Sequence, residues 1–572
     1  MNAEHINADT KPSSVPRGGA DENVNPMADA SHPAHSNTST ANAASAKSAL
    51  DVGPDTVPAT ASLAQPQPDA SAAGRVSKAP GAKRDLTTGP IGSTLLKFAL
   101  PTLGSNILQS LNGSVNAAWI GHYLGPAALS AASNANLILF FLLGTVFGIG
   151  LAATILVGQA VGARDLTRAK QVVGSGLTFY VVVSLIVALA GYQFTPHILT
   201  AMRTPLDARP LAIDYLRVIF IALPFINTLG CATMVLRGAG DARTPFVLMA
   251  LTVVLDIGLN PLLIFGIGPF HGFGIAGSAI ATLTAQVIGI IAMFLLLHHR
   301  RHFLLLHPHE FGFLRPTASI LRALVFKGVP MGMQLFVVSL AAIAMIGMVN
   351  TFGTATTAAY GAVTQLWTYV QMPAVAVGAS VSSMVAQNVG ARRWDRVSKI
   401  TRYGVLFSVI MTALPTVVIL IFSRGALGLF LGSETEAIRI GMHINEVVIG
   451  TFTLFGIMFV LSGAVRATGA VMPPLLLLTF SLWGVRIPFA RALLPKYGAE
   501  AIWWSFPLGM IVAVTLVGLY YKFGNWRQSK MLDKMPPPPP APASPVAAEA
   551  TAPVPTGAAP AGASPAVMTE GR

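Results

Sequence analysis

Asp256 lies in an apolar stretch, 245–266, that is long enough to cross a membrane, and it is the acidic residue placed deepest in such a stretch. A charged side chain near the centre of a bilayer costs roughly 3 kcal/mol, so an acidic residue at that depth predicts a function. Asn260 follows four residues later and therefore shares a helix face with Asp256. The alternative is a structural carboxyl group that is hydrogen-bonded to a neighbouring helix.

Pro261 should bend this helix, because it has no N–H and its ring clashes with the carbonyl group of Ile257. The carbonyl freed by the bend would join the side chains of Asp256, Asn260 and Thr282 in a set of hard oxygen ligands. Such a set suits a monovalent cation. It suits equally a proton on Asp256, with the amide and the hydroxyl as hydrogen-bond partners. We therefore predict that this site binds H⁺ or Na⁺ and that the protein has no other cofactor.

The composition requires a membrane around these helices. Only 10% of the 572 residues are charged, 53% are hydrophobic and the mean hydropathy is +0.62, values that a soluble chain of this length would not sustain. Apolar stretches of membrane-spanning length recur twelve times, which predicts an all-α integral membrane protein. They lie at 94–118, 127–156, 171–195, 211–235, 245–266, 275–298, 328–350, 356–386, 402–423, 438–463, 472–493 and 501–523.

The net charge of +14 would suggest a nucleic-acid partner for a soluble protein, but here the positions of the charges decide. Most lysines and arginines follow the even-numbered stretches, as at Arg164, Arg243, Arg300 and Arg392. By the positive-inside rule both termini then face the cytoplasm. We expect a multi-pass protein of the plasma membrane, the inner membrane in a bacterium, which contacts small molecules and lipid and binds no nucleic acid.

Two halves of the chain repeat each other. A run that reads Gln-x-x-Gly-Ala-Arg ends the second stretch at 159–164 and the eighth at 387–392, and Pro101 recurs 229 residues later as Pro330. Each half contains an even number of stretches, so the halves are parallel copies related by a pseudo-twofold axis along the membrane normal. We predict twelve transmembrane helices in two six-helix lobes.

The predicted lobes cover 89–309 and 310–525. Residues 1–88, rich in Ala, Ser and Pro, and residues 526–572, rich in Pro and Ala, are predicted to be disordered cytoplasmic tails. The five prolines at 536–540 leave open a second reading, a ligand for a proline-binding domain.

Metal chemistry is not favoured by the remaining residues. Cys231 is the single cysteine, which excludes a disulfide framework and a thiolate cluster. His298 and His302 are four residues apart and could share a metal on one helix face. Arginines at 300 and 301 make a basic linker beside the membrane the better reading, so we predict no metal centre.

A Gly-x-Gly-Asp run at 238–241 matches the signature of intramembrane aspartyl proteases. Such an enzyme needs two facing carboxylates that share a proton. Asp241 instead lies in a turn between basic residues, and its counterpart in the second half is Ala470. We therefore predict that the protein is not an enzyme.

These motifs, in this order, resemble the multidrug and toxic compound extrusion (MATE) family of secondary antiporters, which have two six-helix lobes. The resemblance extends over nearly all of 90–525. Besides Pro101 and the two Gln-x-x-Gly-Ala-Arg runs, it rests on Leu111 to Asn116, Leu236 to Asp241, Leu255 to Ile264 and Gly277 to Thr282.

The resemblance implies that the first span packs beside the fifth, which would bring Asn116 to the site of Asp256. The sequence departs from the family at this point, because the position of Asn116 is commonly an aspartate there and the Asp and Asn of the fifth span are in reversed order. Acidic residues that some members carry in the second half are absent at Val338 and Phe455.

Glu446 suggests a separate acidic site in the second lobe. It stands where the first half has Arg217 (446 − 217 = 229), near the predicted outer end of its span. We treat it as a second proton or cationic-drug site.

Polar residues in otherwise apolar stretches would line a cleft between the lobes. Aromatic and methionine side chains lie near them in sequence and suit amphipathic ligands of varied shape. The alternative is that each polar group only links two helices. The candidates are Gln109, Asn134, Gln334, Gln365 and Tyr369.

The sequence thus predicts a secondary active exporter that antiports amphipathic or cationic organic compounds against H⁺ or Na⁺, acting as a monomer. Ion binding at Asp256 would switch the bundle between inward and outward openings, with Pro101, Pro261 and Pro373 as helix bends. The alternative is a flippase for lipid-linked oligosaccharide precursors, from a related fold group. It would favour a strongly cationic cleft, for which Arg486 is the main candidate.

Overall fold

The computed structural model describes residues 86–266, 272–432, 434–529 and 531, and these belong to one compact unit. The predicted tails fall almost entirely outside the described residues. Their disorder, and the limits of the two lobes, therefore stay predictions. Within the described residues the regular structure is helical and contains no strand.

The first half begins with a helix of 72 residues, α1, that contains the first two predicted spans. Its backbone breaks at Gly125, where φ is 82° and ψ is −179°. This conformation is nearly exclusive to glycine, so the residue type explains why one span ends and the next begins there. The helices of this half are α1 (Ile91–Gly162), α2 (Leu166–Ala201), α3 (Arg209–Gly238), α4 (Arg243–Phe265) and α5 (Ile275–His299).

The second half is more interrupted. The span predicted at 438–463 is two helices, separated at Ile449 and Gly450, and the span predicted at 472–493 contains a π-helical segment. The elements are η2 (Pro308–Leu314), α6 (Ala318–Val349), η3 (Asn350–Phe352), α7 (Thr354–Gly390), α8 (Trp394–Ile421), α9 (Ser423–Leu431), α10 (Thr435–Val448), α11 (Thr451–Thr468), α12 (Met472–Thr479), η4 (Phe480–Arg486), α13 (Ile487–Tyr497), α14 (Ala499–Phe523) and η5 (Asn525–Gln528).

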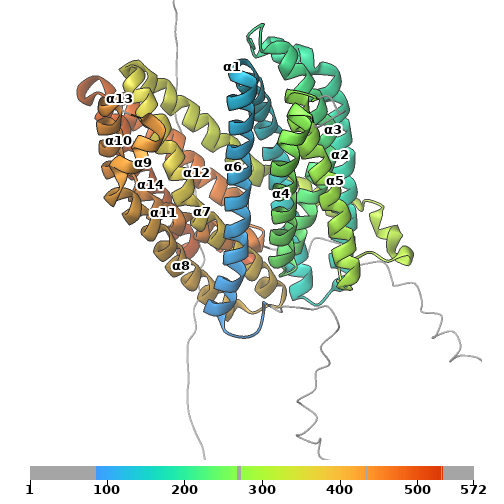
Figure 1. Cartoon of the computed structure of the whole chain (residues 1–572). Helices are drawn as coiled ribbons and strands as arrows, with labels where there is room; N and C mark the ends of the chain where they lie inside the picture. The colour runs from blue at the N-terminus through green and yellow to red at the C-terminus, as the bar shows by residue number, and fades with distance from the viewer. Residues whose placement is uncertain (1–85, 267–271, 433, 530, 532–572) are drawn as a thin grey trace, which may run out of the picture. The chain divides into compact units, whose positions relative to one another are not determined.

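The predicted architecture of twelve spans in two lobes is confirmed. Ten helical segments of the described residues are long and apolar enough to cross a membrane, and Ala127–Phe140 and Val146–Gly162 are shorter apolar segments within α1. In the first lobe α3 packs on α1, α2 and α5, and in the second α7 packs on α8 and α11. Figure 1 shows α2, α3 and α5 at one side and α8 to α14 at the other. The chain is a multi-pass membrane protein.

Two equivalent glutamines join the lobes where α1 and α7 end. Gln159 Nε2 donates to the carbonyl of Ala467 at 2.7 Å, and Gln387 Nε2 donates to the carbonyl of Gly238 at 2.9 Å. Donors and acceptors are related by the repeat, because 387 − 159 = 228 and 467 − 238 = 229. Both helices lead into arginine-containing loops, so we call this end of the molecule the basic end.

Glycines allow the two helix ends to touch. A Cβ atom on Gly162 would overlap the carbonyl group of Gln387, and a Cβ atom on Gly390 would overlap that of Gln159. Only glycine permits such an approach of backbone to backbone. We call Gln159, Gly162, Gln387 and Gly390 the interlobe clasp.

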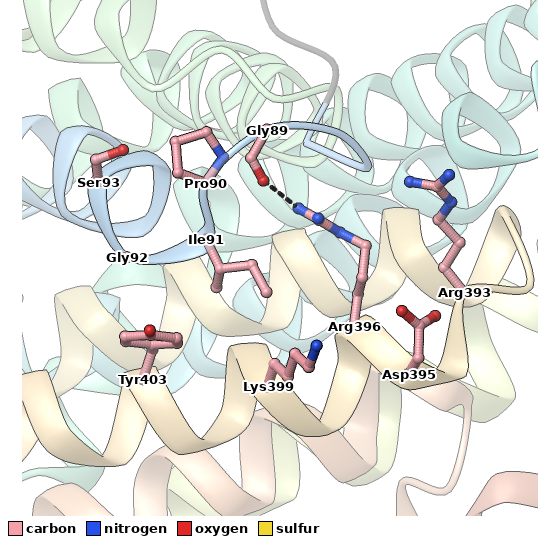
Figure 2. A pocket seen from close by; sticks show the side chains of 10 residues that line it. All are labelled: Gly89, Pro90, Ile91, Gly92, Ser93, Arg393, Asp395, Arg396, Lys399 and Tyr403. Carbon is pink, nitrogen blue, oxygen red and sulfur yellow. Dashed lines mark hydrogen bonds between the residues drawn. The ribbon is translucent and has the colours of Figure 1, made fainter.

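The first described residues pack against the basic end. Leu86 is fully buried, its N–H donates to Gln387 Oε1 at 3.3 Å, and its carbonyl accepts from Asn388 Nδ2 at 3.1 Å. Figure 2 shows the adjoining cavity, of about 670 Å³, in which Arg396 donates to the carbonyl of Gly89 at 3.0 Å. The three residues at the end of the predicted tail, 86–88, are therefore placed by contacts with α7 and α8.

The linker between the halves is fastened to α2. Lys170 Nζ lies 2.7 Å from Glu310 of η2, and Thr178 donates to the carbonyl of Leu314 at 2.8 Å. Of the linker histidines, His302 is buried and stacks on Phe303. Within the described residues, no group of three or more His, Cys, Asp or Glu side chains is arranged to hold a metal ion.

Candidate ion-coupling site

The carboxylate of Asp256 faces the first part of α1. Asp256 is 2% exposed on α4. Asn112 Nδ2 donates to its Oδ2 at 2.8 Å, and Asn116 Nδ2 donates to the same oxygen at 2.9 Å. The two asparagines are four residues apart, so a single face of α1 supplies both donors.

The other carboxylate oxygen is bound from α5 and from α4 itself. The hydroxyl of Thr282 donates to Asp256 Oδ1 at 3.0 Å, and Asn260 Nδ2 lies 3.4 Å from the same oxygen. The Asn260 amide also donates to the Asp256 carbonyl at 2.7 Å and to Asn116 Oδ1 at 3.0 Å. Asn260 thereby links α4 to α1 and orients the Asn116 amide with its nitrogen toward the carboxylate.

Only neutral donors bind this carboxylate among the described residues. The ion pairs there are Lys170 with Glu310, His309 with Glu310, and His443 with Glu500. Hydrogen bonds from N–H and O–H groups favour the charged form of a carboxylate. They leave its negative charge uncompensated in a low dielectric, where a proton or a monovalent cation would neutralise it.

Two acceptors beside Asp256 have no hydrogen-bond partner among the residues that the structure describes. They are Oδ1 of Asn112 and Oδ1 of Asn260, and both atoms are buried. A buried acceptor without a donor is costly. Together with the carboxylate, these two oxygens are ligands of the hard type that Na⁺ takes, so the residues present fit Na⁺ as well as a proton.

The structure brings together the four residues predicted for coupling, Asp256, Asn260, Asn116 and Thr282, and adds Asn112, which the sequence analysis missed. The spacing of four residues between Asn112 and Asn116 was the available signal. The helix bend predicted at Pro261 stays a prediction, because α4 continues through it to Phe265.

Comparison with known proteins decides the family. The family model described as MatE matches residues 101–262 and again 330–491, and the second match begins 229 residues after the first (330 − 101 = 229). The chain belongs to the MATE family. MATE proteins are transporters rather than enzymes, and this chain is a multidrug efflux transporter of that family.

Relatives support the assignment over most of the MATE fold. The chain is 35% identical to "Probable multidrug resistance protein YoeA" of Bacillus subtilis, over 76% of this chain and 94% of the relative. It is 27% identical to an "FAD transporter" of Shewanella oneidensis, over 61% and 76%. A crystal structure of "MATE in the straight conformation" superposes with a TM-score of 0.71 at 20% identity, covering 77% of this chain and 97% of that one.

Asp241 has a structural place in this MATE transporter. Its carboxylate accepts hydrogen bonds from the backbone N–H groups of Arg243 and Thr244, both at 3.0 Å, and from the Thr244 hydroxyl at 2.5 Å. It therefore fixes the start of α4, which in turn carries Asp256.

The five polar residues predicted for the substrate cleft are not joined in one cluster. Among the described residues, no hydrogen bond connects any two of Gln109, Asn134, Gln334, Gln365 and Tyr369. Gln109 and Tyr369 are exposed, and Gln334 accepts a hydrogen bond from Arg466. Their role in binding substrate stays a prediction.

Glu446 is exposed on α10. The buried residue beside it is Asn445, whose Oδ1 accepts from Trp367 Nε1 at 3.1 Å and whose Nδ2 donates to Ser423 Oγ at 3.3 Å. The Glu446 side chain therefore stays outside the polar interior of the second lobe, and an acidic site there stays a prediction.

Proposed function

We propose that this MATE transporter is a secondary active exporter that exchanges amphipathic organic compounds, cationic ones among them, for H⁺ or Na⁺ at Asp256. The proposal is carried by one observation. A carboxylate that is 2% exposed is held by neutral donors from α1, α4 and α5. A group in this position gains most from binding one positive charge.

Ion binding at this site would change how α1 packs. Asn112 and Asn116 join α1 to the carboxylate, and amide donors bind a charged carboxylate more strongly than a neutralised one. Loading the site therefore weakens the attachment of α1 to α4. A change of a few kcal/mol between two arrangements of the bundle is sufficient to shift their populations.

Orientation and compartment follow from charge. The basic end would face the cytoplasm of a cell whose plasma membrane, the inner membrane in bacteria, holds the protein as a monomer with both termini inside. The excess of lysine and arginine in the loops at that end supports this orientation.

Relatives differ in their named cargo. The Bacillus relative is named for multidrug resistance and the Shewanella relative for FAD. Multidrug resistance supports export of amphipathic compounds here. The FAD transporter shows that related chains are also named for an anionic cargo.

The test is efflux from proteoliposomes that contain the full chain and an ethidium load. We expect efflux when a pH or Na⁺ gradient is imposed, and efflux at the gradient-free rate for Asp256→Asn. The control is Asp214→Asn, because Asp214 is an exposed acidic residue near the start of α3. Coupled efflux by Asp256→Asn at the native rate would refute the proposal.

A further inference from the structure

We infer that the second lobe holds a binding site for an oxyanion group of the exported compound, formed by Arg466 and Gln334. The inference rests on the proposed export function and names a substrate class, compounds that carry a carboxylate or a phosphate. The two residues form a cluster of hydrogen-bond donors that lacks an acceptor.

Arg466 lies in the last turn of α11 and is 8% exposed. Its Nη1 donates to Gln334 Oε1 at 2.7 Å, and its guanidinium lies 5.4 Å from the ring centre of Phe459. The described residues offer no partner for its other N–H groups. An arginine has five donors in a planar fork that matches the two oxygens of a carboxylate or phosphate.

Gln334 supplies a second donor of the same kind. Its Oε1 accepts from Arg466, whereas its Nε2 is buried and has no acceptor in the described part of the chain. It lies on α6, two residues after Gly332. There α6 touches α1, because a Cβ atom on Gly148 of α1 would overlap the backbone of Gly332. The cluster therefore lies close to where the two lobes meet, the place where a transported compound must pass.

The interior of the second lobe contains cations without acids. Arg486 lies 3.4 Å from the ring centre of Phe506, and its Nε is also buried without an acceptor. Glu500 pairs with His443. An uncompensated cation in such surroundings is costly, and an anionic ligand removes the cost. Of the other acidic residues described in this lobe, Glu310 pairs with Lys170, and the rest are exposed: Asp395, Glu434, Glu436 and Glu446.

A purely structural role for Arg466 would not explain why the buried Nε2 of Gln334 has no acceptor among the described residues. Arg237 is the counterpart of Arg466 (466 − 237 = 229) and also lies in the last turn of its helix, where a cation is favoured. The counterpart of Gln334 is Ser105 (334 − 229 = 105), whose hydroxyl donates to the Pro101 carbonyl at 3.0 Å. Among the described residues, the second lobe thus places an unsatisfied amide donor beside its arginine, whereas the equivalent hydroxyl of the first lobe has its acceptor. The buried Nε of Arg237 also lacks an acceptor, so the difference between the lobes lies in Gln334 and not in the arginine.

Binding to the purified full chain tests the inference without any gradient. Fluorescence anisotropy compares rhodamine B with its ethyl ester, and riboflavin 5′-phosphate with riboflavin. The first pair differs only in a free carboxylate and the second only in a phosphate. We expect the anionic member of at least one pair to bind about tenfold more tightly or better, the scale of charge-assisted hydrogen bonds.

Gln334→Glu is the decisive variant, because it supplies Arg466 with a carboxylate inside the protein. We expect the preference for the anionic probe to disappear while thermal stability is kept or raised. Arg466→Gln should also abolish the preference, and Arg237→Gln is the matched control that should keep it.

Two results would overturn the site: equal binding of both members of both pairs, or a preference that survives Gln334→Glu. The outcome is separable from that of the export proposal. Gradient-driven efflux of the rhodamine ester without any anion preference removes the oxyanion site alone. An anion preference without gradient-driven efflux removes ion coupling alone.

Discussion

The carboxylate of Asp256 is held by neutral donors and has no cationic partner among the described residues, and this arrangement is the basis for proposing that one small cation binds there. Asn112, Asn116 and Thr282 reach the carboxylate from two other helices. Each bond is worth about 1.5–3 kcal/mol when one partner is charged. The same bonds hold α1 and α5 against α4, so an ion that binds there, as we propose, would also change helix packing.

Asn112→Leu tests this dependence at the residue that the sequence analysis missed. Removal of one donor to Asp256 Oδ2 makes the ion-free carboxylate less stable, so a coupling proton should bind about tenfold more tightly or better. Proton-coupled efflux should slow because the proton is released less readily. A coupling Na⁺ would also lose the Asn112 Oδ1 ligand, so it should not bind more tightly. The measurement is the ion concentration for half-maximal efflux in proteoliposomes. The control is Asn106→Leu, on the same helix, and an equal shift in both variants would contradict the mechanism.

Depth and spacing were enough to predict part of this site. An acid in the middle of an apolar stretch and an amide four residues later identified Asp256 and Asn260 without a structure. Asn116 came only from the family resemblance, because the residues alone do not say which helix packs on α4. Asn112 could not be predicted, because the sequence does not say which face of α1 points toward α4. Gln334 was predicted as polar, but its unsatisfied amide depends on Arg466, 132 residues away.

Helix breaks govern the architecture at the next scale, and the break at Gly125 divides α1 into two spans. Gly125→Ala should lower the free energy of unfolding by about 1–3 kcal/mol, because a Cβ is poorly tolerated at φ 82°. Gly113→Ala is the matched control, since no atom lies within 4 Å of its added Cβ and the position is helical. Thermal unfolding in detergent measures the stability of both variants. Equal stability would contradict the prediction, because it would mean that the backbone at position 125 accepts a Cβ without strain.

The linker between the lobes should respond to acid through Glu310. Burial acts to raise the pKa of Glu310, but hydrogen bonds from Lys170 and from the His307 N–H, with the Lys170 charge, hold it below its ordinary value. A lowered pKa in the folded state stabilises the fold above the ordinary pKa of a glutamate, and the contribution is lost as pH falls through the lowered value.

Lys170→Met should therefore lower the free energy of unfolding by about 1 kcal/mol at neutral pH. The difference from the native chain should shrink below about pH 4, where glutamates become protonated. Thermal unfolding as a function of pH provides the measurement. Lys97→Met, at an exposed lysine of α1, is the control. A pH-independent difference would mean that Lys170 acts through packing alone.

Sequence patterns were reliable for the number of spans and weaker for their internal form. Hydropathy predicts that 438–463 is apolar, but the division into α10 and α11 at Ile449 and Gly450 follows from backbone geometry that hydropathy does not report. Likewise, no pattern in the sequence predicts the ion pair between Glu310 and Lys170 of α2. Long-range pairs of this kind leave no periodic signal in a single sequence.

Because the two halves are copies, the contacts that join the lobes at the basic end come in pseudo-symmetric pairs. Each glutamine of the interlobe clasp donates to a carbonyl of the opposite lobe, and each glycine admits the opposite helix. The repeated Gln-x-x-Gly-Ala-Arg runs thus form one contact between the lobes, at the basic end. Alternating access requires this contact to break when the basic end opens, so its strength sets the balance between the two openings.

Replacing both glutamines, as Gln159→Leu with Gln387→Leu, should shift that balance toward opening at the basic end. Each substitution removes a buried hydrogen bond and leaves a carbonyl, that of Ala467 or Gly238, without its donor. Such losses cost about 1–3 kcal/mol each. Two of them approach the few kcal/mol that separate the states of a transporter, so a minor open population should become a major one.

Spin labels at Ala163→Cys and Ala391→Cys would report the change, because these equivalent residues follow the ends of α1 and α7. Cys231 is the single native cysteine and is buried, so a Cys231→Ser background leaves only the introduced pair. Double electron–electron resonance should show a longer distance between the two spin labels when both glutamines are replaced. Gln371→Leu is the control, since the Gln371 amide bonds within its own helix to the Trp367 carbonyl at 3.3 Å. An unchanged distance in the double variant would mean that the glycine contacts, rather than the glutamines, keep the lobes together.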